Sequence, residues 1–379
     1  MLKESAMRFL SAHSPTAVAR NAMTLPGNVD LALWGRMTQE LGWQAIPVPE
    51  SSEGLGLGLV ELTLLLEETG ACLSPIPLMS SALSALALRM VPDSETQRSI
   101  LQAIAGGAVV TLAHTAARPD WGAPGIAVSA AKSGEGWRLH GEARFVSCGA
   151  VADWLLVATV SEDQRNVMLF GLPSDLAGIA VNHRVTLDQT RSMADVQLEN
   201  VVVEESALLA DNWLSALETA LDMGRVLVAA EQVGCAQRAL DITVDYVGER
   251  VQFGRTIASF QAVKHKAADM MLKVESARSL LYYAACTADA WLRGNARAEA
   301  VREAAAMVAS TAGDAAFFVA GTGIQLHGGV GITEEYDIQL YFKRARALES
   351  YLGRPDESRE VIAAALLDVD APGADSHAA

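Results

Sequence analysis

The sequence predicts an α+β fold with three consecutive parts: an N-terminal helical domain, a middle antiparallel β-domain and a C-terminal four-helix bundle. Three observations support this prediction. Apolar residues recur at helical spacing in the first part, short runs rich in Val, Leu and aromatic residues follow, and long Ala-rich helical patterns come last. The sequence has no alternating β–α–β units and no G-x-G-x-x-G turn after a strand, which disfavours a Rossmann fold.

The N-terminal helical domain is assigned to residues 1–110. Leu33, Met37 and Leu41 recur at helical spacing, and a leucine-rich stretch repeats the pattern after a turn-rich loop. Pro75 ends the second stretch because proline lacks the N–H group that a helix interior needs.

The middle β-domain is assigned to residues 111–207. Runs at 154–160, 167–172 and 196–203 are short and apolar, and clusters of Gly, Asp and Asn separate them. This pattern is typical of a small antiparallel sheet.

The C-terminal bundle is assigned to residues 208–367. A 3.6-residue period runs through 226–247, and similar patterns cover 263–292 and 298–320. Alanine-rich helices of this length indicate close antiparallel packing. The remaining residues, 368–379, are small and polar, and we expect a flexible tail.

The composition excludes several classes of protein. The 379 residues carry a net charge of −16, which argues against a nucleic-acid partner and against a basic membrane anchor. Two uncharged stretches, 99–117 and 315–333, are long enough to span a membrane, but both contain glycine pairs and polar residues, so we expect no membrane segment. The four cysteines form no C-x-x-C pair and the seven histidines no metal-binding spacing, which predicts a cytoplasmic protein with reduced thiols and no metal site.

The densest local motif lies where one long helix ends and the next begins. It contains Arg250, Phe253, Gly254 and Gln261. An arginine beside a tight bend can present its planar guanidinium to a diphosphate, and a phenylalanine ring offers a face for stacking. On local composition alone, the favoured interpretation is a helix–loop–helix corner with a surface arginine.

A glycine-rich segment follows the last long helical pattern. Five glycines occur in the eleven residues 321–331, and the segment includes Gln325, Gly328 and Gly329. Glycine at this density indicates close approach of the backbone to another group, and phosphate or adenine is a natural candidate. The spacing matches neither a P-loop nor a Rossmann turn.

Together and in this order, the motifs resemble those of the acyl-CoA dehydrogenase family. These flavoproteins remove two hydrogens from the α and β carbons of an acyl-CoA thioester. The resemblance is carried by Leu41-Gly42-Trp43, Pro49-Glu50, Gly54-Leu55-Gly56, Arg250-x-x-Phe253-Gly254, Phe260-Gln261, Ala268-Asp269-Met270 and Gln325-x-x-Gly328-Gly329-x-Gly331. It implies the same three-part fold, FAD as cofactor, an acyl-CoA substrate, a tetramer built as a dimer of dimers, and an electron-transfer flavoprotein as possible electron acceptor.

The resemblance also implies roles for individual residues. Residues of the last domain would reach the diphosphate and adenosine of a neighbouring subunit's FAD: Arg250, Phe253, Gln261, Gln325, Gly328 and Gly329. Phe145 and Ser147 would line the flavin ring of the chain's own subunit. Asp222 and Arg225 would face the pantetheine and thioester end of the substrate.

The sequence departs from the family where the chemistry takes place. Family members abstract the α-proton with a carboxylate of raised pKa. Leu352 occupies the usual position of this base, and Gly224 occupies the alternative position before Arg225. The segment 114–122 also lacks the Thr-Glu-Pro pattern that normally lines the flavin.

These departures lead to three hypotheses. The first is a partner subunit that completes the FAD site of a sister subunit in a hetero-tetramer, as in family members that shorten steroid side chains. The second is a self-sufficient homomeric enzyme whose base is relocated, with Glu349, Asp356 and Glu357 near the expected loop and Glu349 as the weak candidate. The third is a helical scaffold or binding protein without FAD.

Overall fold

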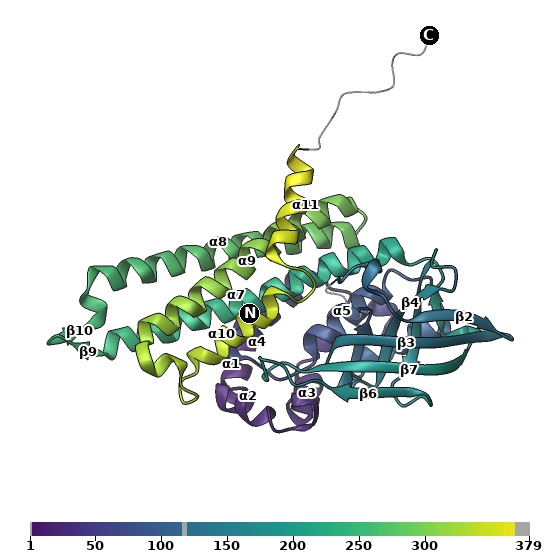
Figure 1. Cartoon of the computed structure of the whole chain (residues 1–379), viewed down its shortest axis with the longest axis horizontal. Helices are drawn as coiled ribbons and strands as arrows, with labels where there is room; N and C mark the ends of the chain where they lie inside the picture. Colours follow the sequence, from purple (N-terminus) through teal and green to yellow (C-terminus); the bar gives the residue numbers. More distant parts are fainter. Residues whose placement is uncertain (1, 116–119, 368–379) are drawn as a thin grey trace, which may run out of the picture.

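The structure is a computed structural model that describes residues 2–115 and 120–367 (Figure 1). Its first part is helical. The helices are α1 (Leu2–His13), α2 (Thr16–Ala22), α3 (Leu31–Glu40), α4 (Leu59–Cys72), α5 (Leu78–Leu88) and α6 (Glu95–Ala105). Side-chain caps fix two of their starts: Asp30 accepts a hydrogen bond from the Leu33 N–H at 2.9 Å, and Ser94 accepts one from the Gln97 N–H at 3.1 Å.

The second part is one eight-stranded sheet. Its strands are β1 (Val110–Ala113), β2 (Ser129–Ser133), β3 (Gly136–Ser147), β4 (Trp154–Ser161), β5 (Val167–Pro173), β6 (Ile179–His183), β7 (Met193–Glu204) and β8 (Leu208–Ala210). The strand order is β6-β7-β3-β2-β4-β5-β8, and β1 pairs with β4. The sheet thus extends slightly beyond the predicted limits of 111 and 207.

Most strand pairings are antiparallel, as predicted, but β4 runs parallel to both β1 and β2. Parallel neighbours need a long connection, and residues 114–153 between β1 and β4 provide one. The hydrophobic pattern of a strand does not encode the direction of its neighbour, so sequence reasoning missed this feature.

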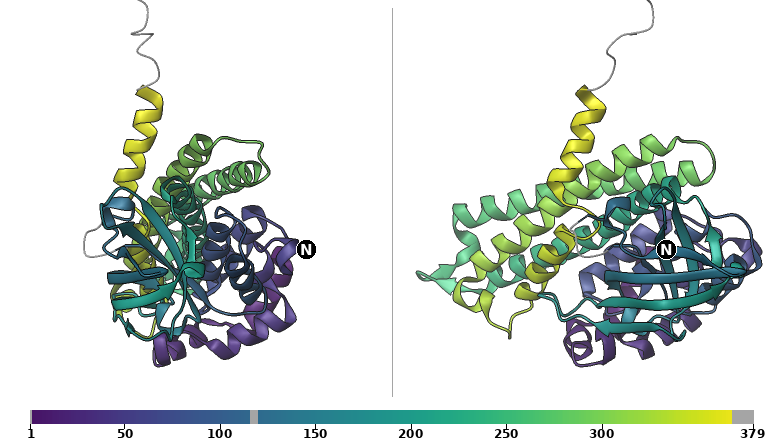
Figure 2. Two further views of the ribbon diagram at one scale, coloured as in Figure 1. Left: turned by 90° about the vertical axis from the view of Figure 1, so that its right-hand side faces the viewer. Right: turned by 45° about the vertical axis from the view of Figure 1, so that its right-hand side comes forward.

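The third part is helical again. It consists of α7 (Leu214–Glu249), α8 (Gln261–Leu292), α9 (Ala298–His327), α10 (Ile338–Glu349) and α11 (Pro355–Leu367). A short hairpin, β9 (Val251–Gln252) with β10 (Arg255–Thr256), joins α7 to α8. Figures 1 and 2 show the long helices extending away from the sheet, with the hairpin at their far end. Helices α7 to α10 pack on one another, and α11 packs against α9 as a fifth helix. The predicted flexible tail, 368–379, lies outside the described residues.

One segment, Ala298–Ile332, is long and apolar enough to cross a membrane by length and composition. It comprises α9 and the turn after it, and 61% of its most apolar window is buried inside the protein. Such burial is typical of a core helix in a bundle. Val308 and Val319 of this segment are fully buried in the interior.

A single hydrophobic core joins the three parts. Its fully buried members include Leu62 of α4, Leu86 of α5, Leu155 of β4, Leu227 of α7 and Val308 of α9. A second, smaller cluster lies where α7, α8, α9 and α10 meet, around Leu240, Val274 and Tyr341. The N-terminal helices and the sheet are therefore packed on the same bundle rather than joined to it by linkers.

Helices α4 and α7 cross closely in this core, and two glycines let their backbones meet. A Cβ atom added to Gly234 would lie 1.8 Å from the Glu67 carbonyl oxygen, and one added to Gly70 would lie 2.4 Å from the Glu231 carbonyl oxygen. Real Cβ atoms do not approach backbone so closely, so any side chain here would push the helices apart. The Cys235 thiol, which donates to the Gly70 carbonyl at 3.2 Å, adds a contact at the same place.

We predict that Gly234→Ala lowers the free energy of unfolding by roughly 1–3 kcal/mol, because its Cβ overlaps the α4 backbone. Gly248→Ala is the matched control on the same helix. A Cβ there meets nothing within 4 Å, so this change should stabilise α7 by about 0.5–1 kcal/mol. Urea unfolding of both variants is the measurement, and equal effects would contradict the close contact.

Candidate functional site

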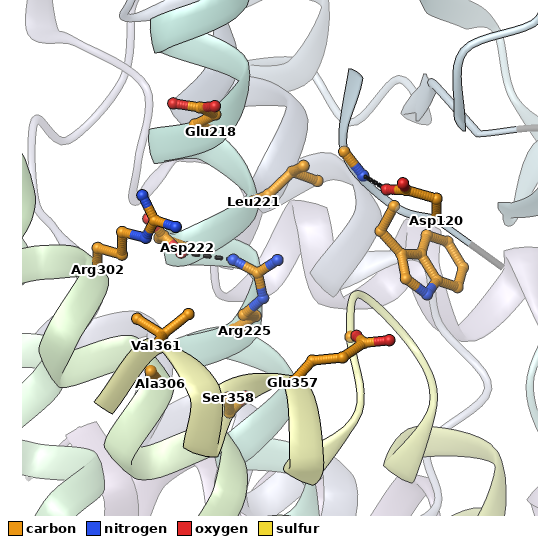
Figure 3. Close-up of a pocket in the computed structure, with 13 residues that line it drawn as sticks. Asp120, Glu218, Leu221, Asp222, Arg225, Arg302, Ala306, Glu357, Ser358 and Val361 are labelled. Atoms are coloured by element: carbon orange, nitrogen blue, oxygen red, sulfur yellow. Dashed lines mark hydrogen bonds and ion pairs between the residues drawn. The ribbon is translucent and has the colours of Figure 1, made fainter. Parts of the chain in front are cut away.

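A pocket of about 370 Å³ lies where α7, α9, α11 and the segment 120–122 meet (Figure 3). Its charged lining residues are Asp120, Glu218, Asp222, Arg225, Arg302 and Glu357. The structure thus brings together Asp222 and Arg225, the two residues expected to face an acyl-CoA. Sequence reasoning missed Glu218 and Arg302. The first lies one helical turn before Asp222 and could have been found by this spacing, whereas the second comes from another helix and left no sequence signal.

Arg225 is held in place by two partners. Its Nη1 donates to Asp222 Oδ1 at 2.5 Å, and its Nε donates to the Leu352 carbonyl oxygen at 2.8 Å. Burial raises the pKa of Asp222 and outweighs the opposing effect of the Arg225 charge. Figure 3 shows Arg302 directed toward Asp222 from α9. The guanidinium of Arg225 therefore ties α7 to the loop in which the family's base is expected.

The two expected positions of the base are in direct contact, and no carboxylate occupies either. Leu352 is fully buried, and a Cβ added to Gly224 would lie 2.6 Å from Leu352 Cδ1 and 3.3 Å from Leu83 Cδ1. Leu352 also has a φ of +64°, a left-handed conformation that is uncommon for a leucine. The space in which a base would stand is thus filled by hydrocarbon.

The nearby carboxylates lie elsewhere. Glu349, the weak candidate for a relocated base, pairs with Arg346 on the same turn of α10 and does not line the pocket. Asp356 pairs with Arg354, and its carboxylate is more than half exposed. Glu357 does line the pocket, where it accepts a hydrogen bond from the Arg354 N–H at 2.9 Å. The structure places none of these three in the space between Leu352 and Gly224.

The residues expected around a flavin ring leave little room for one. Ser147 is buried and lines a cavity of only about 30 Å³, enough for one or two water molecules. Arg191 fills part of this region, with an ion pair to Glu231 at 2.5 Å and its guanidinium 4.7 Å from the Tyr351 ring centre. The cavity that Ser147 lines is therefore too small for an isoalloxazine.

Phe145, two residues before Ser147, has one face of its ring covered by an arginine side chain. It is 40% exposed, with a φ of +55° at an irregular point of the β3–β7 register. The Arg184 guanidinium lies 4.9 Å from the centre of the ring and is fixed by Asp195. A cation–π contact therefore occupies one face of the aromatic ring that was expected to cover a flavin.

The altered segment 114–122 packs against the loop that contains Leu352; its residues 116–119 lie outside the described residues. Trp121 donates from Nε1 to the Ser350 carbonyl at 2.9 Å and meets Tyr351 edge-on at 5.1 Å. The His114 ring lies 5.8 Å from Trp121. Burial of the imidazole lowers the pKa of His114 to about 4.

The six residues predicted to reach a neighbour's cofactor are all exposed and lie at the far end of the bundle: Arg250, Phe253, Gln261, Gln325, Gly328 and Gly329. Phe253 at the tip of the hairpin is 91% exposed. Within the described chain, the side chains of Arg250, Gln261 and Gln325 form no hydrogen bond or ion pair.

The backbone of this surface is open as well. A Cβ at Gly328 or Gly329 would meet nothing within 4 Å, and Gly328 has a φ of +67° with ψ of −143°, which glycine alone adopts readily. A free guanidinium, an exposed ring and a glycine backbone with open space around it fit the diphosphate and adenosine end of FAD. We call these six residues the distal surface.

The order of helices, sheet and bundle is the fold of a class of flavin-dependent oxidoreductases. The family description "Acyl-CoA dehydrogenase, N-terminal domain" matches residues 1–108, and "Acyl-CoA dehydrogenase, C-terminal domain" matches residues 213–367. This chain belongs to the acyl-CoA dehydrogenase family.

Three relatives illustrate the match. The acyl-CoA dehydrogenase IpdE2 of Mycobacterium tuberculosis is 32% identical, over 94% of this chain and 93% of its own. The ChsE4–ChsE5 complex of Mycobacterium tuberculosis contains a chain that is 26% identical, with a TM-score of 0.86 over 98% of this chain and 97% of that one. The Tcur3481–Tcur3483 steroid acyl-CoA dehydrogenase contains one that is 28% identical, with a TM-score of 0.84 over 97% of each chain.

The contact between Gly224 and Leu352 predicts strong coupling in a double-mutant cycle. In the native chain, Gly224→Ala should destabilise the fold, because its Cβ overlaps Leu352 Cδ1. In a Leu352→Ala background the same change should cost much less, because only the 3.3 Å approach to Leu83 Cδ1 remains and alanine favours the helix by about 1 kcal/mol. Urea unfolding of the four variants measures this coupling, and additive effects would show that the two positions do not touch.

Burial of His114 predicts a loss of stability in acid. Its pKa in the folded chain, about 4, lies below the ordinary value of 6.5, so the unfolded chain binds the proton first as the pH falls. Stability should be complete above pH 6.5 and decline toward pH 4 by up to about 3 kcal/mol. His114→Leu should flatten this part of a pH series of urea-unfolding curves. His140→Leu, at an exposed position of β3, is the control and should leave the decline intact.

Proposed function

We propose that this chain is the partner subunit of a heteromeric acyl-CoA dehydrogenase and that its distal surface completes the FAD site of a sister subunit. The observation that supports this most is the contrast between two regions. The distal surface is open and unpaired, whereas the chain's own base positions are closed by the contact of Leu352 with Gly224. A chain that catalysed the reaction alone would need a carboxylate at its base positions, whereas a partner subunit needs only the distal surface.

The distal surface would act on the cofactor by binding alone. Arg250 would hold the diphosphate through charge-assisted hydrogen bonds, Phe253 would stack on a ring, and Gly328 and Gly329 would let the cofactor approach the backbone closely. FAD, when bound, supplies hydride acceptance at the substrate's β carbon. The α-proton would be taken by a carboxylate of the sister subunit.

We further propose an acyl-CoA substrate that is steroid-derived, a hetero-tetrameric assembly and a cytoplasmic location. The likeness to a steroid acyl-CoA dehydrogenase and to the ChsE4–ChsE5 complex supports the substrate class and the mixed assembly. The four cysteines, all free in the structure, support a reducing compartment. An electron-transfer flavoprotein is the proposed electron acceptor.

The experiment compares the chain purified alone with the chain co-purified with an acyl-CoA dehydrogenase paralogue encoded beside it. With a dye as electron acceptor, we expect turnover from the complex and none from the lone chain. Arg250→Ala should weaken FAD binding by the complex about 10- to 100-fold, because it removes hydrogen bonds to a charged group. Arg165→Ala, in the β4–β5 turn, is the matched control and should change neither affinity nor turnover.

Two outcomes would favour the other hypotheses. Full turnover by the lone chain would establish a self-sufficient enzyme, and the variants Glu349→Gln and Glu357→Gln would then test which carboxylate acts as its base. A complex that stays colourless in excess FAD, judged by visible flavin absorbance, would favour a scaffold that does not use the cofactor.

A further inference from the structure

We infer that Tyr246 and His327 are positioning residues, which hold the two halves of the distal surface in register without touching the ligand. The inference rests on the proposed function, since it concerns how the same surface would bind FAD. The two halves come from distant parts of the chain: Arg250 follows α7, and Gly328 and Gly329 follow α9. A diphosphate bound by both requires them to stay at a fixed separation.

The two side chains join the helix ends directly. The rings of Tyr246 and His327 are stacked, with centres 4.3 Å apart and planes 18° from parallel. The Tyr246 hydroxyl donates to the His327 carbonyl oxygen at 3.2 Å. Because that carbonyl belongs to the peptide unit leading into Gly328, the bond fixes the start of the glycine segment itself.

Each ring is also tied closely to its half of the surface. The Arg250 N–H donates to the Tyr246 carbonyl at 2.9 Å, which ends α7 one turn after the tyrosine. His327 Nδ1 lies 2.7 Å from the Gly323 carbonyl oxygen, one turn back in α9. A displacement of either ring would therefore be passed to the backbone of Arg250 or Gly328.

Small residues allow this close approach of the two helices. A Cβ added to Gly323 would lie 2.7 Å from Ile338 Cδ1 and 2.8 Å from Thr243 Oγ1, so only glycine permits α9 to lie so near α7 and α10. The far end of the segment is held as well. Tyr336 meets both rings edge-on at 6.1 Å, and Arg20 of α2 pairs with Asp337 at 2.8 Å.

The burial of the pair argues for positioning rather than contact with a ligand. His327 is 6% exposed and Tyr246 is half-buried, whereas the six residues of the distal surface are exposed. The ring of His327 is already engaged by Tyr246 and by the Gly323 carbonyl. The buried pair of rings can therefore fix the positions of Arg250 and Gly328 without binding a ligand itself.

The test measures FAD affinity of the assembled complex by quenching of flavin fluorescence. We expect Tyr246→Ala to weaken affinity about tenfold, the loss of roughly one well-placed charge-assisted hydrogen bond. Tyr246→Phe keeps the stacked ring and should retain most of the affinity. Tyr282→Phe is the matched control, since it also removes one hydroxyl hydrogen bond, to Glu67 at 3.0 Å, far from the surface.

A double-mutant cycle separates positioning from a general loss of structure. If Tyr246 acts through Arg250, Tyr246→Ala should have little further effect on FAD affinity in an Arg250→Ala background. Additive losses, or an unchanged affinity of Tyr246→Ala in a complex that assembles normally by size-exclusion chromatography, would overturn the inference. Failure of Arg250→Ala alone to lower affinity would instead overturn the proposed function.

Discussion

The crossing of α4 and α7 at Gly70 and Gly234 is the contact on which the remaining structure depends. It brings two backbones together without side chains between them and excludes water from their surroundings. The two glutamates that flank it are consequently buried and paired: Glu67 with Lys3 and Arg278 at 2.9 Å each, and Glu231 with Arg191 at 2.5 Å. An unpaired carboxylate at this depth would be strongly destabilising, so the close crossing and the ion pairs require each other.

Because α7 is anchored at its middle, it serves as the common reference for both functional regions. Its first half carries Asp222, Gly224 and Arg225, and its last turn carries Tyr246. The pocket near the start of α7 and the distal surface are therefore connected by one helix, which any assembly with a second subunit would place as a unit. The loop that contains Leu352 is packed with apolar groups: Tyr351 meets Trp121 edge-on, and Leu352 lies against Gly224, where a base would otherwise need a shaped, polar cavity.

Sequence reasoning reached the order of helices, sheet and bundle because burial imposes a period of 3.6 or 2 on each element. It assigned the distal surface through the resemblance of these motifs to those of the family, and the role of this surface in binding FAD stays a prediction. It did not reach the parallel pairing of β4 or the place of Arg302 in the pocket, since both are set by contacts between distant segments. The contact of Leu352 with Gly224 belongs to the same class. The sequence shows separately that Leu352 and Gly224 occupy the two base positions, but only the structure shows that these residues are in contact.

The core that joins all three parts has a kinetic consequence. The apolar face of α4 packs against α7, yet Gly234 follows Gly70 by 234 − 70 = 164 residues. At ribosomal rates of about 5–20 residues per second, this delay lasts roughly ten to thirty seconds. During that interval the buried leucines of α4, among them Leu62, Leu65 and Leu66, lack the surface that covers them in the finished chain. The nascent N-terminal helices are thus exposed to aggregation until most of the protein has been made, and shielding by a chaperone would matter most in that period.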